Sequence, residues 1–226
     1  MKLILIRHGE TEWVRQGRYQ GSTDVPLNKI GILQAHALGK ALKSEKPRII
    51  YCSELLRAYQ TAHEIAKTCR KDITVDKRLN ELCFGDWEGH HHARIHQKFP
   101  KASEAWYAAN WKSCPPGGES LKSLDLRINS FLTDLSEHYS KNSTHVLVSH
   151  GGPIRMFLVR ILKIAPTVFW TIRIDPASIS MVHLTLDRRE LLLLNSQAHL
   201  IPPPAFGLKG RLSFKARRRR EKQVVG

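Results

Sequence analysis

Two short apolar runs, far apart in the chain, each end in a histidine that is followed by glycine. Residues 3–6 lead into Arg7 and His8, and residues 146–149 lead into His150. Short apolar runs of this kind are typical of buried strands. Open α/β sheets bind their ligands at the carboxyl ends of the strands. The sequence therefore predicts that both histidines meet at one such edge, in a pocket that the arginine makes cationic.

Strand-like and helix-like segments alternate along the rest of the chain. We expect strands at residues 2–6, 48–51, 73–75, 145–149, 179–186 and 191–194. We expect helices at residues 28–43, 54–69, 121–139 and 153–162, with Cys52-Ser53 as the N-cap of the second helix. This alternation indicates an α/β protein with a mostly parallel central sheet that helices cover on both faces.

One region interrupts this alternation. Residues 85–118 hold three consecutive histidines and the tryptophans Trp87, Trp106 and Trp111, and they end in a Pro-Pro-Gly-Gly sequence. We interpret residues 85–118 as an inserted helical lid, called the lid segment below. Its aromatic residues could stack on an aromatic substrate, although packing within the lid is the commoner role for such residues.

Composition limits the class of protein. Of the 226 residues, 42% are hydrophobic, which is enough for one large domain with a substantial core. No apolar stretch reaches the length of a membrane span, and the first residues lack the pattern of a signal peptide, so we expect a cytoplasmic protein. The four cysteines lie far apart without a CxxC pair, which predicts reduced thiols and neither a zinc site nor a disulfide framework.

Positive charge is concentrated near the end of the chain. The net charge is +16, and eight Lys or Arg with a single Glu lie between Lys209 and Lys222, behind a run of three prolines. Charge blocks of this kind are usually solvated, so we expect a domain over residues 1–201 and a disordered basic tail over residues 202–226. Contact of the tail with nucleic acid or acidic lipid is the alternative. The basic balance of the remaining chain favours a small anionic substrate.

His8 is the candidate nucleophile. A neutral imidazole attacks phosphorus well when its tautomer is fixed and the phosphate is held in line. Arg7 can bind phosphate oxygens bidentately, and Gly9 permits close approach of the backbone. His150, when protonated, can donate to a phosphate oxygen, and Arg57 can reach the same pocket from the start of a helix. The alternatives are a strand-end histidine and a helix-capping histidine with local hydrogen bonds, but the combination favours phosphoryl transfer through a phosphohistidine.

A leaving alkoxide needs a proton, so a carboxylic acid is expected beside the phosphate. Three carboxylates in one short stretch, Glu81, Asp86 and Glu88, compete for this role. Glu10 is a fourth carboxylate, and we interpret it as structural or as a residue that orients the pocket. A metal is the remaining possibility in the lid segment, because His92 and His96 are spaced to share one face of a helix, but no second cluster of ligands accompanies them.

Several separated motifs together resemble the histidine phosphatase superfamily, the phosphoglycerate-mutase-like group, over about residues 1–200. The motifs are Arg7-His8-Gly9-Glu10-Thr11, Gly17-Arg18-Tyr19-Gln20-Gly21, Ser53 with Arg57 and Thr61-Ala62, Leu79-Asn80-Glu81 with Phe84-Gly85-Asp86-Trp87-Glu88, and Ser149-His150-Gly151. The resemblance implies a three-layer α/β/α sandwich that uses neither a metal nor an organic cofactor.

The resemblance also implies roles for individual residues. His8 would be the phosphorylated nucleophile and Glu81 the general acid, with Arg7, Arg57 and His150 as the phosphate clamp. Four further residues that match the motifs complete the expected phosphate-binding set: Arg18, Gln20, Gly21 and Gly151.

Within the superfamily, the segment after Glu81 is similar to the phosphatases rather than the mutases, and it resembles the α-ribazole phosphatases of cobalamin biosynthesis in particular. The expected function is therefore a phosphomonoesterase acting on α-ribazole 5′-phosphate. Phosphoglycerate mutase, a broad-specificity phosphatase and an inactive phospholigand-binding module are the alternatives. One departure from the family pattern is Val14, where Asn is common, and Arg15, Gln16 or Arg18 could supply the missing donor.

Overall fold

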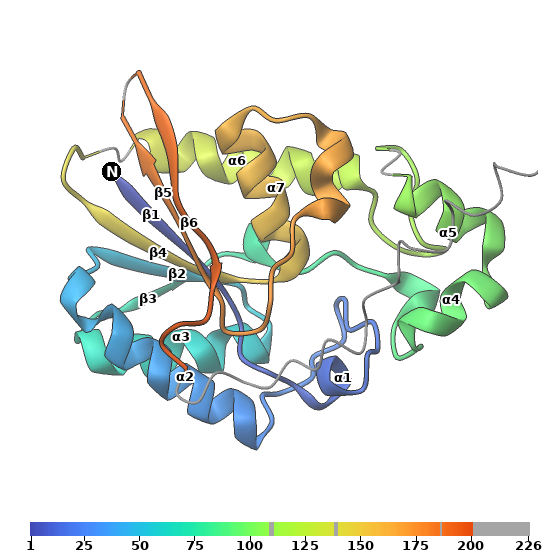
Figure 1. Cartoon of the computed structure of the whole chain (residues 1–226), viewed down its shortest axis with the longest axis horizontal. Coiled ribbons are helices and arrows are strands. Elements are labelled where there is room, and N and C mark those ends of the chain that lie inside the picture. The colour runs from blue at the N-terminus through green and yellow to red at the C-terminus, as the bar shows by residue number, and fades with distance from the viewer. Residues whose placement is uncertain (109–110, 138–139, 186, 201–226) are drawn as a thin grey trace, which may run out of the picture.

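A six-stranded sheet forms the centre of the molecule in a computed structural model that describes residues 1–108, 111–137, 140–185 and 187–200 (Figure 1). The strands are β1 (Lys2–Arg7), β2 (Ile49–Cys52), β3 (Ile73–Val75), β4 (Thr144–Ser149), β5 (Ile179–Leu184) and β6 (Arg189–Ser196). Their order in the sheet is β3-β2-β4-β1-β5-β6. The first four strands are parallel, through the pairs β1–β4, β4–β2 and β2–β3, whereas β5 pairs antiparallel with β1 and β6. The predicted mostly parallel sheet and the closing hairpin are both confirmed.

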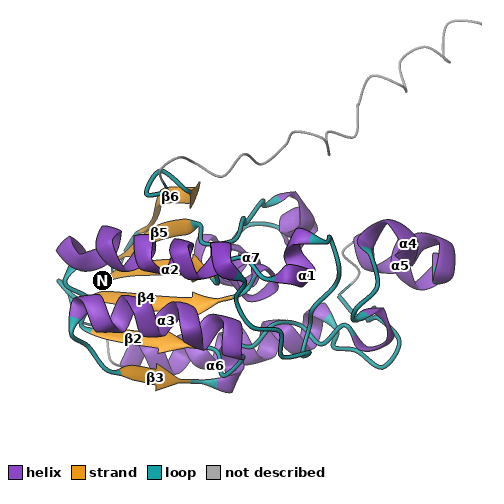
Figure 2. Ribbon diagram, turned by 90° about the horizontal axis from the view of Figure 1, so that it is seen from below, coloured by secondary structure: helices purple, strands orange, loops and turns teal. Residues whose placement is uncertain are grey.

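Helices cover both faces of the sheet (Figure 2). α2 (Lys29–Leu42) and α3 (Leu56–Cys69) lie on one face, and α6 (Leu121–Glu137) and α7 (Gly151–Leu162) lie on the other. Successive side chains of a strand point to opposite faces, so Ile4 and Ile6 pack toward α2 and α3, while Leu3 and Leu5 pack toward α6 and α7. The continuous apolar run of β1 thus reflects burial on two sides, and the result is the expected three-layer α/β/α sandwich.

Most element boundaries lie within two residues of the predicted ones, with one error that concerns the site. α3 begins at Leu56 with Leu55 as its N-cap, so the prediction of a Cys52-Ser53 cap is wrong. The Ser53 hydroxyl accepts a hydrogen bond from the amide of Leu55 and otherwise faces Asn80 and His150. The sequence prediction also missed the short helix α1 (Glu12–Arg15).

The lid segment is helical, as predicted, and extends beyond the carboxyl ends of the strands (Figure 1). It contains α4 (His92–Lys98) and α5 (Pro100–Tyr107). Trp87 and Trp106 are fully buried, with ring centroids 6.1 Å apart, and the indole N–H of Trp170 donates to the carbonyl of Trp106 at 2.9 Å. These two lid tryptophans therefore pack the interior of the lid and are not available to a substrate.

Some predictions fall outside the described residues: the helix end at 138–139, residue 186, and the tail over 202–226. Within the described ranges, no helix combines the length and apolar character that crossing a membrane requires. All four cysteines are free thiols, as predicted.

Candidate active site

The carboxyl ends of β1 and β4 lie side by side, with Arg7 in register with Ser149. The residues that follow, His8 and His150, therefore come together, and their ring centroids are 5.0 Å apart with the ring planes inclined at 58°. Both side chains are buried, with 1% and 0% of their surface exposed. The predicted meeting of two imidazoles at one sheet edge is thus found in the structure.

The ring of His8 is held in one orientation. Its Nδ1 lies 2.7 Å from the carbonyl oxygen of Gly9, so Nδ1 carries the proton and Nε2 keeps its lone pair. Gly9 also lets the loop pack closely against the start of α2, because a Cβ there would lie 2.6 Å from the carbonyl oxygen of Gly31. Burial, followed by the charges of Arg57 and Arg7, lowers the pKa of His8 well below its usual value. The imidazole is therefore neutral at pH 7, with the lone pair of Nε2 unprotonated.

His150 is fixed through Ser53. The Ser53 hydroxyl donates to Asn80 Oδ1 at 2.7 Å, so the His150 Nε2–H donates to Ser53 Oγ at 2.8 Å. The other ring nitrogen, Nδ1, is buried and has no hydrogen-bond partner among the described residues. Burial and the charge of Arg57 lower the pKa of His150. Protonation of Nδ1, as the sequence analysis expected, thus requires a nearby anion to offset those two effects.

Two arginines reach the histidines with their guanidinium groups anchored on main-chain carbonyls. Arg7 donates from Nη1 to Ile174 at 2.7 Å, and Arg57 donates to Gly21 at 2.7 Å and to Thr23 at 2.9 Å. The Nε atoms of both arginines are buried and lack a partner among the described residues. Burial lowers the pKa of Arg57 to about 10, so it remains charged at pH 7. Fixed cations of this kind suit a bound phosphoryl group.

Glu88 fixes the loop that holds Arg57. Its carboxylate accepts hydrogen bonds from the amides of Ser22, Thr23 and Phe84 at 2.8–3.0 Å and from the Thr23 hydroxyl. Gly21 adopts a left-handed conformation with φ of +57°, and a Cβ there would collide with the Glu88 carboxylate. Glu88 is therefore a structural carboxylate, which removes it from the three candidates for the general acid.

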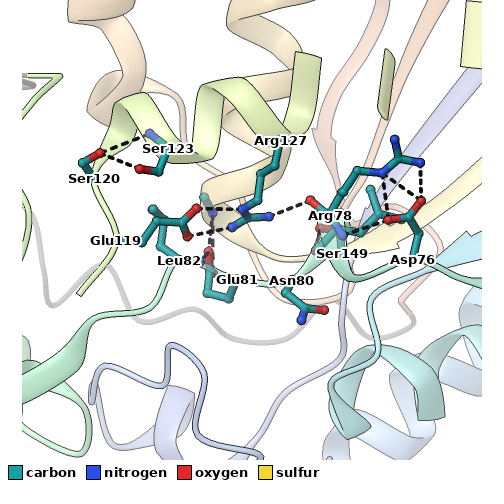
Figure 3. Close-up of polar contacts among 12 residues, drawn as sticks. Asp76, Arg78, Asn80, Glu81, Leu82, Glu119, Ser120, Ser123, Arg127 and Ser149 are labelled. Atoms are coloured by element: carbon teal, nitrogen blue, oxygen red, sulfur yellow. Dashed lines mark hydrogen bonds and ion pairs between the residues drawn. The ribbon is translucent and has the colours of Figure 1, made fainter. Parts of the chain in front are cut away.

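Glu81 is the candidate general acid that lines the cavity. Its Oε1 accepts from the amide of Gly152 at 3.1 Å and from its neighbour Leu82 at 3.0 Å. The segment that carries Glu81 is held in turn by Arg127, which donates to Glu119 and to the carbonyl of Arg78 (Figure 3).

The other carboxylates have different surroundings. Asp86 is exposed and does not line the cavity, and Glu10 accepts from the Asn28 side chain at 2.8 Å. Glu81 is thus the only one of the four carboxylates considered from the sequence that lines this cavity.

A cavity of about 380 Å³ is lined by Arg7 and Gly151, the chain neighbours of the two histidines, whereas His8 and His150 themselves lie buried behind its wall. Its lining includes most of the residues expected to bind phosphate: Arg7, Arg18, Gln20, Gly21 and Gly151. Arg18 donates to the carbonyl of Gly89 at 2.9 Å, and the Gln20 Oε1 accepts from the Thr11 hydroxyl at 2.6 Å. Arg57 lies beneath the cavity wall rather than on it, since its side chain is fully buried.

Sequence reasoning missed several residues of the cavity. Arg155 lines it from α7, Trp170 and Asp175 from the region between α7 and β5, and His92 from the lid segment. No motif indicated Trp170 or Asp175, because their approach depends on how the chain folds back after α7. The position of Arg155 could have been predicted from its spacing. It lies one helical turn after Gly151, so both residues share the face of the helix that borders the site.

The residues near Val14 and the histidines of the lid segment have protein partners of their own. The side chains of Arg15 and Gln16 both donate to Glu12 on the surface, so of the three candidates to replace the missing donor at Val14 only Arg18 lines the cavity. His96 contacts the hydroxyl of Ser103 at 3.0 Å, and no group of three potential metal ligands is found in the part of the chain that the structure describes.

Residues 3–197 match the sequence profile of the histidine phosphatase superfamily (branch 1), and the chain belongs to this superfamily. It is 36% identical over 200 residues to phosphoserine phosphatase 1 of Hydrogenobacter thermophilus, covering 88% of this chain and 94% of that protein. It is 33% identical over 201 residues to the adenosylcobalamin/alpha-ribazole phosphatase of Escherichia coli K12, covering 88% and 97%.

Solved structures agree with these relatives. The mycobacterial glucosyl-3-phosphoglycerate phosphatase in complex with VO3 superimposes with a TM-score of 0.80 at 30% identity, covering 86% of this chain and 99% of that chain. Family, relatives and fold together make this chain an enzyme of the phosphatase type, whereas the individual relatives carry three different substrate names.

Proposed function

We propose that this protein hydrolyses phosphomonoesters of small cytoplasmic metabolites through a phosphohistidine at His8. The observation that carries the proposal is the orientation of the His8 ring, with Nδ1 bound to the Gly9 carbonyl and Nε2 left as the nucleophile. The neighbouring cations and Glu81 supply the other groups that phosphoryl transfer needs.

The first step transfers the phosphoryl group to the enzyme. The Nε2 lone pair of His8 forms a bond to phosphorus as the bond from phosphorus to the ester oxygen breaks. The leaving oxygen takes the electron pair of that bond and a proton from Glu81, which gives a free alcohol. Arg7, Arg57 and His150 stabilise the charge that spreads over the other phosphoryl oxygens.

The second step returns the enzyme to its starting state. Glu81, now a carboxylate, accepts a proton from a water molecule while the water oxygen attacks phosphorus. The bond between Nε2 and phosphorus breaks, inorganic phosphate is released, and His8 becomes neutral again. The proton taken from water restores the acid form of Glu81, so protons balance over the cycle.

Two candidate substrates should be assayed first. The resemblance to the α-ribazole phosphatases favours α-ribazole 5′-phosphate, and Phe84, Tyr107 and Trp170 give the cavity an aromatic side on which a benzimidazole could stack. O-phospho-L-serine is the second candidate, because the cavity holds Arg18 and Arg155 in addition to the clamp. The identity of 36% to a phosphoserine phosphatase supports it as well.

The test is a panel of phosphorylated metabolites with the full chain and its His8→Ala variant. We expect the wild-type chain to release phosphate, to form an acid-labile phosphoprotein after rapid quenching, and to lose both properties when His8 is replaced. Isomerisation of 3-phosphoglycerate without release of phosphate would establish the mutase instead. Near-normal turnover by His8→Ala would refute the mechanism, and tight phosphate binding without turnover in the wild type would indicate a binding module.

The catalytic unit in this proposal lies within residues 1–201. Removal of residues 202–226 should therefore leave kcat unchanged. The truncated variant also tests whether the tail binds DNA or acidic lipid. If it does, the full chain should show salt-dependent binding that the truncated variant lacks.

A further inference from the structure

One partly buried cation of the cavity, Arg155, has no part in the phosphoryl transfer described above. Arg155 lines the cavity from the second turn of α7. Its Nε donates to the carbonyl of Ile172 at 2.7 Å, and its guanidinium carbon lies 5.6 Å from the ring centroid of Trp170 and 5.9 Å from that of Phe169. These contacts fix the plane of the guanidinium. Within the described ranges, no residue accepts a hydrogen bond from its Nη atoms.

No side chain of the cavity wall forms a hydrogen-bonded ion pair with Arg155 among the described residues, although the charges of Glu81 and Asp175 favour its charged form. Asp175 also lines the cavity, but its carboxylate accepts from Arg173 at 2.8 Å and from the Asn195 amide at 2.9 Å. Burial and the charge of Arg7 lower the pKa of Arg155 to about 10, so the side chain still carries its charge at pH 7. Partial burial of a cation without a hydrogen-bonded anion is destabilising, and a bound anion would offset part of that cost.

The position of Arg155 relative to Glu81 tells which part of a substrate it would meet. A Cβ placed on Gly151 would lie 3.2 Å from Nη1 of Arg155 and 3.9 Å from Oε2 of Glu81, so the two side chains flank the same backbone position. In the proposed mechanism Glu81 protonates the leaving oxygen. Arg155 therefore lies on the side of the leaving group and close to the ester oxygen.

We propose that Arg155 is a specificity residue that binds a carboxylate carried by the leaving group, within a few bonds of the ester oxygen. A fixed guanidinium with free Nη atoms matches a carboxylate in a bidentate pair. The inference rests on the proposed function and deepens it, because it assigns the substrate to the phosphomonoesters of small hydroxy acids. It favours O-phospho-L-serine over α-ribazole 5′-phosphate, whose leaving group carries no carboxylate.

A matched pair of substrates isolates this contact. O-phospho-L-serine and phosphoethanolamine differ by the carboxylate alone. We expect the wild-type chain to prefer phosphoserine in kcat/KM, and Arg155→Met to lower kcat/KM for phosphoserine by roughly 10- to 100-fold, mainly through KM. With phosphoethanolamine as substrate, kcat/KM of the same variant should stay within about threefold of the wild-type value, because the methionine keeps the apolar packing on Trp170.

Two controls separate specificity from a structural role. Arg160→Met removes an arginine of the same helix that pairs with Asp125 away from the cavity, and it should leave the preference unchanged. Arg155→Lys keeps the charge and should restore part of the phosphoserine activity. Equal loss on both substrates in Arg155→Met, or a wild-type chain without preference for phosphoserine, would overturn the inference.

A binding measurement keeps the inference testable without turnover. 3-Phosphoglycerate and glycerol 3-phosphate differ in whether a carboxylate or a hydroxymethyl group ends the chain. Calorimetry with His8→Ala should show tighter binding of 3-phosphoglycerate, and Arg155→Met added to His8→Ala should remove that difference. Equal binding of the two esters to His8→Ala would reject the carboxylate subsite. If only the proposed function fails, the preference for binding 3-phosphoglycerate should remain while the wild-type chain hydrolyses no ester.

Discussion

The two ends of the cavity are built in different ways. At the inner end, called the phosphate end below, Arg7 lines the cavity and His8, His150 and Arg57 lie buried beneath it. All four residues lie at the end of a strand or the start of a helix, and main-chain carbonyls or a buried serine hold their polar atoms. The outer wall, formed by His92, Tyr107, Arg155 and Trp170, comes from the lid segment and from the region around α7 and the turn after it.

This difference explains how enzymes of one family can act on several substrates. The phosphate end is fixed by the sheet, whose register cannot shift without turning the core side chains outward. The outer wall depends on contacts among side chains of the lid segment and of residues 155–170, which can change without disturbing the sheet. We therefore expect substitutions at the phosphate end to affect all substrates alike, and substitutions in the outer wall to affect selectivity.

The strongest test of the comparison is Arg57→Met. It removes a cation from the phosphate end and leaves the carbonyls of Gly21 and Thr23 without their donor. Loss of one preorganised donor to the transition state costs about 100- to 1,000-fold, so kcat/KM should fall by that factor for every ester tested. Lys67→Met, an exposed change on the same helix, is the control. A variant that lost activity on one ester and kept it on another would contradict the division between the two ends.

Gly152→Ala tests the carboxylate between the two ends. A Cβ at this position would lie 2.5 Å from Oε1 of Glu81 and 2.9 Å from Cδ1 of Leu82, so Glu81 must move. We expect kcat to fall by roughly 10- to 100-fold for alkyl phosphates, which need a proton on the leaving oxygen. The loss should be smaller for p-nitrophenyl phosphate, whose leaving group is stable as an anion.

Glu81→Gln is the matched comparison for Gly152→Ala. The double variant should be no slower than Glu81→Gln, since both changes remove the same function. Additive losses in the double variant would show that Gly152 acts through a group other than Glu81.

The buried imidazoles predict how stability depends on pH. The pKa values of His8 and His150 are lowered well below 6.5 in the folded chain, so between those values and 6.5 the unfolded chain binds more protons. The free energy of unfolding should therefore be highest above pH 6.5 and fall as the pH decreases, by about 1 kcal/mol per histidine for each pH unit.

Urea unfolding at pH 7.5, 6.0 and 5.0 measures this dependence. In the His8→Asn variant one of the two contributions is missing, so the decline between pH 6.5 and 5 should be shallower. An equal decline in both proteins would show that the folded chain takes up a proton at His8 as readily as the unfolded chain does.

Local signals predicted the phosphate end because each of its residues follows an element that the sequence itself specifies. His8 and His150 end apolar runs, and Arg57 follows a third strand, so parallel pairing alone brings them to one edge. The prediction of an N-cap at Ser53 failed because the hydroxyl is engaged by Asn80 and His150, contacts that link residues far apart in the chain.

The outer wall could not be predicted in the same way. Trp170 and Asp175 carry no motif, and their position depends on how the region after α7 packs against the lid segment, for example through the hydrogen bond from Trp170 to Trp106. Whether a lid tryptophan faces the core or the cavity is likewise decided by tertiary packing. Periodicity within a single helix does not contain that information.

The smallest expected effect concerns the hydrogen bond that joins the lid segment to the floor of the cavity. The hydroxyls of Tyr19 and Tyr107 are bonded to each other, and Tyr19 is buried whereas Tyr107 is 46% exposed. Burial and this contact raise the pKa of Tyr19, so its hydroxyl is neutral at pH 7. Tyr107→Phe leaves the buried Tyr19 hydroxyl without its partner, which should lower the free energy of unfolding by about 1 kcal/mol.

A double-mutant cycle with Tyr19→Phe distinguishes this bond from general packing. Tyr19→Phe removes both the hydroxyl and the need for a partner, so Tyr107→Phe should cost little in that background, with a coupling of about 0.5–1.5 kcal/mol. In the wild-type background Tyr107→Phe should raise KM by a few-fold and leave kcat unchanged, because the lid segment positions the leaving group but does not touch the phosphoryl group. A fall in kcat with KM unchanged would mean that the lid segment acts on the phosphate end as well, and the separation between the two ends would not hold.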